Sequence, residues 1–296
     1  MKLYVRVLAL VAAALLTGAC ARPGTTNGRA ATPDSLRVMS FNIRYGTAKD
    51  GVNAWPLRRD LVLGVIQDHG PAVLGVQEAL RFQLDEIRQA VPWLAEIGVG
   101  REDGVDAGEY SAILYDRRRL SVEDSGTFWL SETPDVPGST SWGNNITRIA
   151  TWARFRERGT DREFNVLNTH WDHESQNARE RSAAQIAEWL DEHAASQPVI
   201  VLGDFNSGEQ NPAFQTLVAP GTREVQLRDT FRAVHPDAAL AGTFNEFTGK
   251  RDGDKIDAVL ASSEWRVLSA AIVTSSDNGR YPSDHFPVTA TLAFPP

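Results

Sequence analysis

The sequence predicts a mixed α/β or α+β domain that contains more than one β-sheet. Short apolar runs of strand length alternate with amphipathic helical patterns from about residue 35 to the C-terminus, with no linker between them. The chain of 296 residues is long enough to bury a large core, and its composition of 42% apolar and 23% charged residues is that of a globular protein. These observations favour one continuous domain over residues 35–296.

Helices and strands are predicted from hydrophobic periodicity and from turn residues at their ends. The clearest helix begins at Pro56, whose fixed φ suits a first turn, and ends before Gly70. Leu57, Leu61 and Val65 recur along it at a spacing of four and predict its buried stripe. The other predicted helices are 80–91 and 177–193, and the predicted strands are 36–43, 72–77, 110–115, 149–155, 164–169, 198–202, 256–260 and 288–292.

Residues 1–19 have the layout of a secretory signal. Lys2 and Arg6 precede an apolar run that is too short to span a bilayer as a helix. Cys20 follows two small residues, at the place where a bacterial lipoprotein carries its acylated cysteine. Cleavage after Ala21 is the alternative, because the residues around Cys20 also fit an ordinary cleavage site. Both interpretations predict export, either as a periplasmic or cell-surface lipoprotein or as a secreted protein.

Residues 20–34 are predicted to be a lipidated cysteine followed by a flexible tether, because they are small, polar and free of large apolar side chains. Removal of residues 1–19 takes away two positive charges and no negative ones, which changes the net charge from −8 to −10. A negative domain exerts no general attraction on polyanions. This counts against long nucleic acid as the preferred substrate.

Polar residues that suit phosphoester chemistry stand at or just beyond the ends of the predicted strands, where loops mount functional groups on a rigid scaffold. Carboxylates with further oxygen ligands suit a hard cation such as Mg²⁺, whereas the sequence has no His-x₃-His or cysteine pair typical of zinc. Histidines beside an Asp/Asn pair suit the activation of water and the stabilisation of phosphoryl charge. These residues are Asn42, Glu78, His170, Asp204, Asn206, Asp257, Asp284 and His285.

As a set, the motifs around these residues resemble those of the endonuclease/exonuclease/phosphatase superfamily, which includes pancreatic-type deoxyribonucleases. The resemblance extends over residues 36–294 and implies a four-layer sandwich, in which two mixed β-sheets pack face to face with helices outside. The motifs, in the order of the family, are Met39-Ser-Phe-Asn-Ile, Gly75-Val-Gln-Glu, Asn168-Thr-His-Trp-Asp-His, Gly203-Asp-Phe-Asn, Lys255-Ile-Asp and Ser283-Asp-His-Phe-Pro-Val.

The resemblance also implies a metal site. Glu78 is similar to the principal Mg²⁺ ligand of the family, Asn42 to a group that holds the metal or its water, and Asp284 to a second carboxylate on the metal side. Mn²⁺ is expected to substitute for Mg²⁺. Arg44 stands where some relatives carry an acid, which favours one metal ion over two.

For the remaining residues the resemblance implies catalytic roles. Asp204 is similar to the residue that orients or deprotonates the attacking water, and Asn206 to a phosphate-binding amide. His285 is similar to the catalytic imidazole, with Asp257 fixing its tautomer. His170 is similar to the histidine that hydrogen-bonds a phosphoryl oxygen or protonates the leaving group.

For three further residues, two interpretations are kept open. Arg148 is expected to contact phosphate, with a surface ion pair as the alternative. Glu109 is either a partner for His170 or a loop carboxylate. His173 is interpreted as a residue of the rim or of a helix start.

The leading hypothesis is therefore a Mg²⁺-dependent phosphoesterase outside the cytoplasm, acting as a monomer on a phosphate mono- or diester. A small molecule or lipid head group fits the acidic charge better than nucleic acid. Two alternatives stay open at this stage: an extracellular nuclease of the same fold, and a binding lipoprotein that has lost catalysis.

Overall fold

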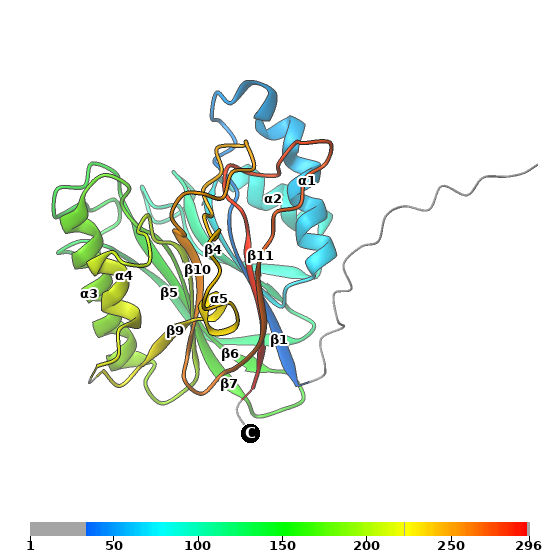
Figure 1. Cartoon of the computed structure of the whole chain (residues 1–296). Coiled ribbons are helices and arrows are strands. Elements are labelled where there is room, and N and C mark those ends of the chain that lie inside the picture. Colours follow the sequence, from blue (N-terminus) through cyan, green and yellow to red (C-terminus); the bar gives the residue numbers. More distant parts are fainter. Residues whose placement is uncertain (1–33, 222, 295–296) are drawn as a thin grey trace, which may run out of the picture. The chain divides into compact units, whose positions relative to one another are not determined.

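The computed structural model describes residues 34–221 and 223–294 (Figure 1). The predicted signal at 1–19 and the tether up to residue 33 lie outside the described residues. No described helix combines the length and the apolarity needed to cross a membrane. The helices are η1 (Gly51–Asn53), α1 (Trp55–His69), α2 (Arg81–Ala90), α3 (Gln176–His193), α4 (Pro212–Val218) and α5 (Thr230–Val234). The strands are β1 (Ser35–Asn42), β2 (Val73–Ala79), β3 (Leu94–Ile97), β4 (Tyr110–Asp116), β5 (Leu120–Trp129), β6 (Ile149–Glu157), β7 (Glu163–His170), β8 (Val199–Asp204), β9 (Leu227–Asp229), β10 (Asp257–Ser262), β11 (Arg266–Ile272) and β12 (Val288–Ala293).

The strands form two six-stranded mixed sheets with the same pattern of directions. The first sheet has the order β11-β12-β1-β2-β4-β3, and the second has the order β5-β6-β7-β8-β10-β9. Each sheet contains one central parallel pair, β1 with β2 and β7 with β8, and all its other pairs are antiparallel. The prediction of two mixed sheets is confirmed.

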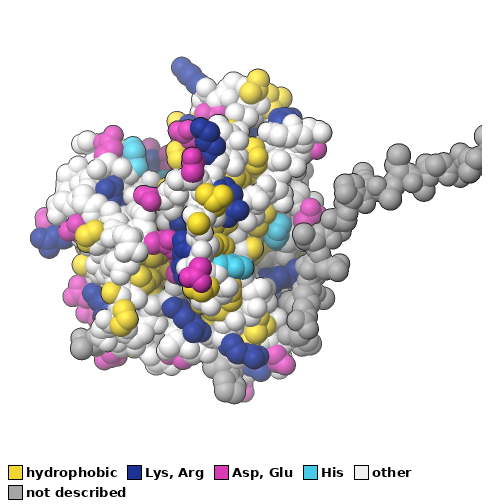
Figure 2. All heavy atoms as spheres, in the orientation of Figure 1, with side chains coloured by type: hydrophobic (Ala, Val, Ile, Leu, Met, Phe, Trp, Pro, Cys, Tyr) yellow, Lys and Arg dark blue, Asp and Glu magenta, His cyan; other side chains and the backbone are white. Residues whose placement is uncertain are grey.

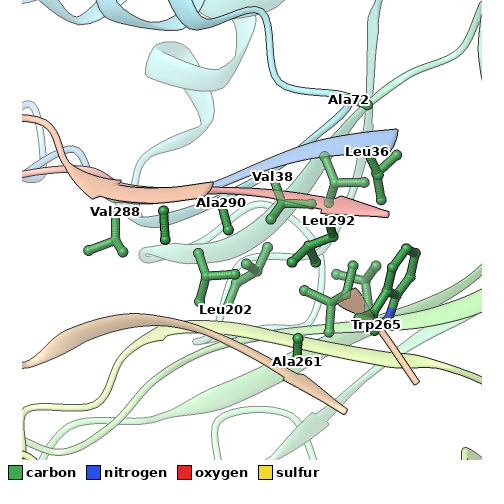
Figure 3. Packing of buried hydrophobic residues seen from close by; sticks show 14 of the residues in the cluster. Leu36, Val38, Ala72, Leu202, Ala261, Trp265, Val288, Ala290 and Leu292 are labelled. Atoms are coloured by element: carbon green, nitrogen blue, oxygen red, sulfur yellow. The ribbon is translucent and has the colours of Figure 1, made fainter. Parts of the chain in front are cut away.

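Three apolar layers hold the sandwich together. The central layer lies between the sheets, where Val38 and Val288 point toward Leu202 of the facing sheet (Figure 3). A second layer packs α3 and α4 against the outer face of one sheet, and a third packs α1 and α2 against the outer face of the other. Figure 1 shows these two helix pairs on opposite sides of the domain. The four-layer architecture follows from these three interfaces.

The topology brings many loops to one edge of the sandwich. Since β1 and β2 are parallel, their carboxyl ends lie at the same edge, and the antiparallel neighbours β4 and β12 begin there. The same holds for the ends of β7 and β8 and the starts of β6 and β10. A hydrogen bond of 2.9 Å between Asn42 and Asp204 joins the ends of β1 and β8, so the two edges meet across the sandwich.

The buried face of α1 differs from the one predicted. Val65 is buried as predicted, but Leu57 is 56% exposed, and the rest of the buried face consists of Trp55, Arg58, Val62 and Ile66. The predicted stripe was wrong at Leu57 because it assumed that only apolar residues face inward. Here an arginine in the first turn is buried and bonded to backbone carbonyl groups.

Candidate active site

Alternation along the strands directs the polar side chains into the space between the sheets. On β8, Ile200 and Leu202 belong to the central apolar layer, and Asp204 follows them with the same parity. The central apolar layer therefore gives way, at the edge of the sandwich, to a group of buried polar side chains, the polar site. Asn42 on β1, His170 on β7 and Asp257 on β10 join Asp204 there in the same way, and none of the four residues is more than 6% exposed.

His285 and Asp257 form the expected hydrogen-bonded pair. The Nδ1 atom of His285 lies 2.9 Å from Asp257 Oδ2 and 3.6 Å from Asp204 Oδ2. Burial lowers the pKa of His285, but the carboxylates of Asp257 and Asp204 more than offset it, so the pKa is raised well above its ordinary value. Because Nδ1 faces the carboxylates, Nε2 is the ring nitrogen left for a ligand.

Asp204 lies between Asn42, His170 and His285 in the polar site. Its Oδ2 accepts a hydrogen bond from Asn42 Nδ2 at 2.9 Å, and its Oδ1 accepts one from the backbone N–H of Asn206 at 3.0 Å. Burial raises the pKa of Asp204 to about 7, and the nearby charge of Asp257 adds to the rise. A carboxylate with a pKa near neutrality suits a general base that works at neutral pH.

His170 is a second imidazole beside Asp204, with its Nε2 atom 3.6 Å from Asp204 Oδ2. Burial lowers the pKa of His170 well below its ordinary value, and the positive charges of Arg148 and Arg101 lower it further. Its Nδ1 atom makes no hydrogen bond to any described residue. The ring is therefore neutral and retains hydrogen-bonding capacity for a ligand.

Glu78 and Asp284 supply carboxylates from the first sheet: Glu78 lies on β2, and Asp284 precedes β12. Glu78 has a left-handed backbone (φ +59°) where the pairing of β2 with β4 is irregular, and its Oε1 accepts from Asn42 Nδ2 at 3.0 Å. Burial raises the pKa of Asp284, and the charge of Glu78 adds to the rise. Glu78 and Asp204 share the Nδ2 donor of Asn42, and Arg44 lies within 4.0 Å of both Glu78 and Asp284, so the three carboxylates form an oxygen-rich cluster around these two side chains.

Arg44 lies beside both carboxylates. Its guanidinium is 3.6 Å from Asp284 Oδ2 and 4.0 Å from Glu78 Oε2, and it pairs with Asp50 at 3.2 Å. A fixed positive charge thus adjoins the oxygen cluster at the position where some relatives have an acid. One metal ion stays the prediction, and the neutralisation by Arg44 favours it.

A different group, Asp204, Asp257 and His285, has ligand atoms that all lie within 4.8 Å of one another. There the Nδ1 atom of His285 is already hydrogen-bonded to Asp257, which is the arrangement of an oriented imidazole. A hard cation takes oxygen ligands in preference to imidazole nitrogen. The oxygen-rich cluster around Glu78 and Asp284 therefore suits a hard cation by its donor type.

Asn206 and Arg148 complete the set of predicted residues at this edge. Asn206 has a left-handed backbone (φ +46°), and its Nδ2 donates to the carbonyl of Trp171 at 2.9 Å. Arg148 is 4% exposed, with Nη2 3.0 Å from Nδ1 of His173 and Nε 3.7 Å from Asp172 Oδ2. The side chain of His173 is about half exposed and precedes α3.

The suggested pairing of Glu109 with His170 is wrong. The carboxylate of Glu109 instead makes two hydrogen bonds to Arg101, at 2.6 and 2.9 Å. Arg101 lies eight residues earlier in a loop, and no periodic pattern in the sequence marks it as the partner. The two arginines, Arg101 and Arg148, both lower the pKa of His170.

Arg58 was not identified from the sequence, although it connects the two halves of the site. Its guanidinium donates to the carbonyls of Ile43 (2.6 Å), Arg44 (2.9 Å), Asn53 (2.9 Å) and Pro282 (3.0 Å). The first two follow Asn42, and Pro282 precedes the segment that carries Asp284 and His285. Arg58 therefore fixes the end of β1 to the loop that carries Asp284 and His285.

Replacing Arg58 with Lys is expected to lower kcat and raise the Mg²⁺ concentration for half-maximal activity, each by about 10-fold, because outer-sphere positioning groups contribute on that scale. A single ammonium group cannot reach four carbonyls on three segments. The matched control is Arg158→Lys, since Arg158 bonds to the carbonyls of Arg117 and Leu120 away from the site. Equal kinetic effects of the two substitutions would contradict the assignment.

Replacing Asp204 with Asn is expected to stabilise the metal-free protein more as the pH rises. The raised pKa of Asp204 favours the protonated folded state, so its stability contribution is complete below about pH 4 and is lost as the pH rises toward 7. Asparagine does not ionise. The Tm of the variant in EDTA should therefore rise relative to the Tm of wild type by several degrees between about pH 5 and 8.

The control for this measurement is Asp116→Asn. Burial raises the pKa of Asp116, but hydrogen bonds from Arg118 outweigh it and the net pKa is lowered. The stability contribution of Asp116 is therefore complete above about pH 4, and the Tm difference between its variant and wild type should stay constant between about pH 5 and 8. A difference between the Asp204 variant and wild type that is constant with pH would show that burial does not control the ionisation of Asp204.

Comparisons with known proteins agree with the observed fold. The sequence model of the Endonuclease/Exonuclease/phosphatase family matches residues 39–285. The solved endonuclease/exonuclease/phosphatase of Bacteroides vulgatus is 35% identical, with a TM-score of 0.81 over 88% of this chain and 99% of that one. The mannosyl-6-phosphatase of Bacteroides thetaiotaomicron is 34% identical, with a TM-score of 0.79 over 88% of this chain and 100% of that one. The catalytic domain of human nocturnin shares the fold at 18% identity, with a TM-score of 0.71 over 88% of this chain and 94% of that one.

Proposed function

The chain belongs to the endonuclease/exonuclease/phosphatase family and is a hydrolase of phosphate ester bonds, and from this premise we propose that it is a Mg²⁺-dependent phosphatase of small phosphate monoesters. The observation that carries the proposal is the buried cluster of Asp204, Asp257 and His285 beside the carboxylates of Glu78 and Asp284. A group suited to general-base catalysis, an oriented imidazole and an oxygen-rich cation site thus lie together in the polar site.

The proposed reaction is the attack of water on phosphorus, with cleavage of the bond between phosphorus and the ester oxygen. Asp204 orients the water and accepts its proton. His285, charged because its pKa is raised, donates a proton from Nε2 to the leaving oxygen and is held in place by Asp257. Neutral His170 donates a hydrogen bond to a phosphoryl oxygen.

Three further groups assist this reaction in the proposal. Asn206 and Arg148 bind the remaining phosphoryl oxygens. Mg²⁺, held by Glu78, Asp284 and Asn42, would supply positive charge against the phosphoryl and leaving oxygens. The oxygen donors of the cluster suit this ion, and Mn²⁺ takes the same donor types.

The preference for small monoesters rests on charge and on similarity. The chain carries a net charge of −8, and Figure 2 shows basic and acidic side chains scattered over the visible face without a continuous basic stripe. Binding of polynucleotides depends on such basic surfaces. The similar mannosyl-6-phosphatase acts, by its name, on a sugar phosphate.

The proposal is tested by a substrate panel with the purified protein. The panel contains hexose 6-phosphates, glycerol phosphate, nucleotides, bis(p-nitrophenyl) phosphate and single-stranded DNA, each with Mg²⁺, Mn²⁺ or EDTA. We expect monoester hydrolysis that EDTA abolishes and Mg²⁺ restores. Preference for the diester or for DNA would favour the nuclease alternative, and activity that persists in EDTA would overturn metal dependence.

We further propose that the enzyme works outside the cytoplasm as a lipoprotein anchored at Cys20. The support is the signal layout of residues 1–19 and the polar composition of residues 21–34. The Cys20→Ala variant is expected to move from the membrane fraction to the soluble fraction with its phosphatase activity unchanged. Fractionation of the variant with membranes, as for wild type, would contradict the anchor.

A further inference from the structure

The loop between α5 and β10 is tied to the catalytic pair through its backbone. Backbone hydrogen bonds of 2.7 Å join Thr243 and Asn245 to the residues on either side of His285, so that Phe244 faces His285 as an isolated antiparallel bridge. The hydroxyl of Thr243 also accepts a hydrogen bond of 3.0 Å from the backbone N–H of Asp257. The position of Phe244 is thus fixed relative to both members of the pair.

Phe244 is exposed although it adjoins a buried group. Its ring lies 5.0 Å from the imidazole of His285 at an angle of 56°, and Phe244 is 44% exposed whereas His285 is 5% exposed. Among the described residues, Phe82 is the other large aromatic side chain with comparable exposure. An exposed aromatic ring beside the buried imidazole offers an apolar face to a ligand of His285.

The backbone that follows Phe244 is strained. Glu246 and Phe247 are consecutive non-glycine residues with left-handed φ values of +52° and +60°. Such conformations persist where surrounding contacts enforce them, and they concentrate at ligand sites. Here the backbone N–H of Glu246 bonds to the carbonyl of Asp284 at 3.2 Å, and the side chain of Glu246 is exposed. The loop therefore carries an exposed carboxylate two residues after the exposed ring of Phe244.

From this juxtaposition we infer that Phe244 and Glu246 form a leaving-group subsite for a hexopyranose, an inference that rests on the proposed phosphatase function. The apolar C–H face of the sugar packs on the ring of Phe244, and the sugar hydroxyls donate hydrogen bonds to Glu246. A nucleobase also stacks on an aromatic ring, but the additional phosphates of a nucleotide or polynucleotide are repelled by Glu246. The pairing of an aromatic face with a carboxylate therefore selects a neutral polyhydroxy leaving group.

The test compares two monoesters that differ only in the leaving group, mannose 6-phosphate and glycerol 3-phosphate, in wild type, Phe244→Ala, Phe244→Tyr and Glu246→Gln. Phe82→Ala is the matched control, since it removes an exposed phenyl ring that makes no ring contact with His285. We expect Phe244→Ala to lower kcat/KM for the hexose phosphate by about 10-fold, mainly through KM, and to change the glycerol phosphate value less than about 2-fold. Phe244→Tyr should retain activity on both esters, and Glu246→Gln should lower only the hexose phosphate value.

The outcomes separate the subsite from the phosphatase function. Equal losses on both esters in Phe244→Ala would show that the ring only positions His285, which overturns the subsite. A wild type that hydrolyses glycerol phosphate but not the hexose phosphate would also overturn the subsite and leave the phosphatase function standing. A wild type that hydrolyses neither monoester would overturn the proposed function itself.

Discussion

The His285→Ala variant is expected to lose about 10³-fold or more in kcat with little change in fold. General acid–base groups contribute about 10²–10⁴-fold, and the positive charge of this imidazole near the phosphoryl group adds electrostatic stabilisation. Asp257→Asn should lose less, because the imidazole stays in place while its tautomer and charge are no longer fixed. Steady-state kinetics with saturating Mg²⁺ measure both effects.

The hydrogen bond of 2.9 Å between His285 and Asp257 leads to a second prediction, which concerns the double variant. Since the two residues act as a unit, the double variant should be little slower than His285→Ala alone. Multiplicative losses in the double variant would show that Asp257 acts independently of the imidazole, for example as a direct ligand of the substrate.

Replacing Glu78 with Gln is expected to raise the Mg²⁺ concentration for half-maximal activity by at least about 10-fold, or to abolish activity. The substitution keeps the shape of the side chain and its acceptor for Asn42, but removes the charge that holds a hard cation. Metal titration of activity and calorimetric Mg²⁺ binding measure the change. Asp50→Asn is the control, because Asp50 shares the partner Arg44 but is not part of the proposed ligand set. Unchanged Mg²⁺ binding in Glu78→Gln would reject the ligand assignment.

Interior strands were predictable from the sequence, and edge strands were not. All the strands with a clear apolar pattern are paired on both sides. The polar residues at or next to their ends lie together in the polar site, as their position in the sequence predicts. The four strands that were not predicted, β3, β5, β9 and β11, are the edges of the two sheets. An edge strand buries less of its surface, so its apolar signal is weak; β5, for example, exposes Glu123 and Asp124.

The motif residues were predictable, whereas their supporting contacts depend on tertiary structure. Asp204, Asp257 and His285 lie far apart in the chain, but each stands in a recognisable motif at the end or start of a strand. Arg58 and Phe244 belong to no such motif. A buried arginine that binds carbonyls and an exposed phenylalanine both reverse the usual relation between residue type and burial, so composition and periodicity cannot indicate them.

The position of the last strand has a consequence for how the enzyme is made. The C-terminal strand β12 inserts between β11 and the N-terminal strand β1, pairing Ala293 with Ser35. Asp284 and His285 precede this strand, so a nascent chain on the ribosome lacks both groups, and the strand that joins β11 to β1, until the last part of the domain has been made. Such sequence-distant pairing slows folding, because chain entropy is lost before contacts compensate for it. We therefore expect chains that end before Asp284 to be inactive, and hydrolysis to begin only after β12 has paired with β1.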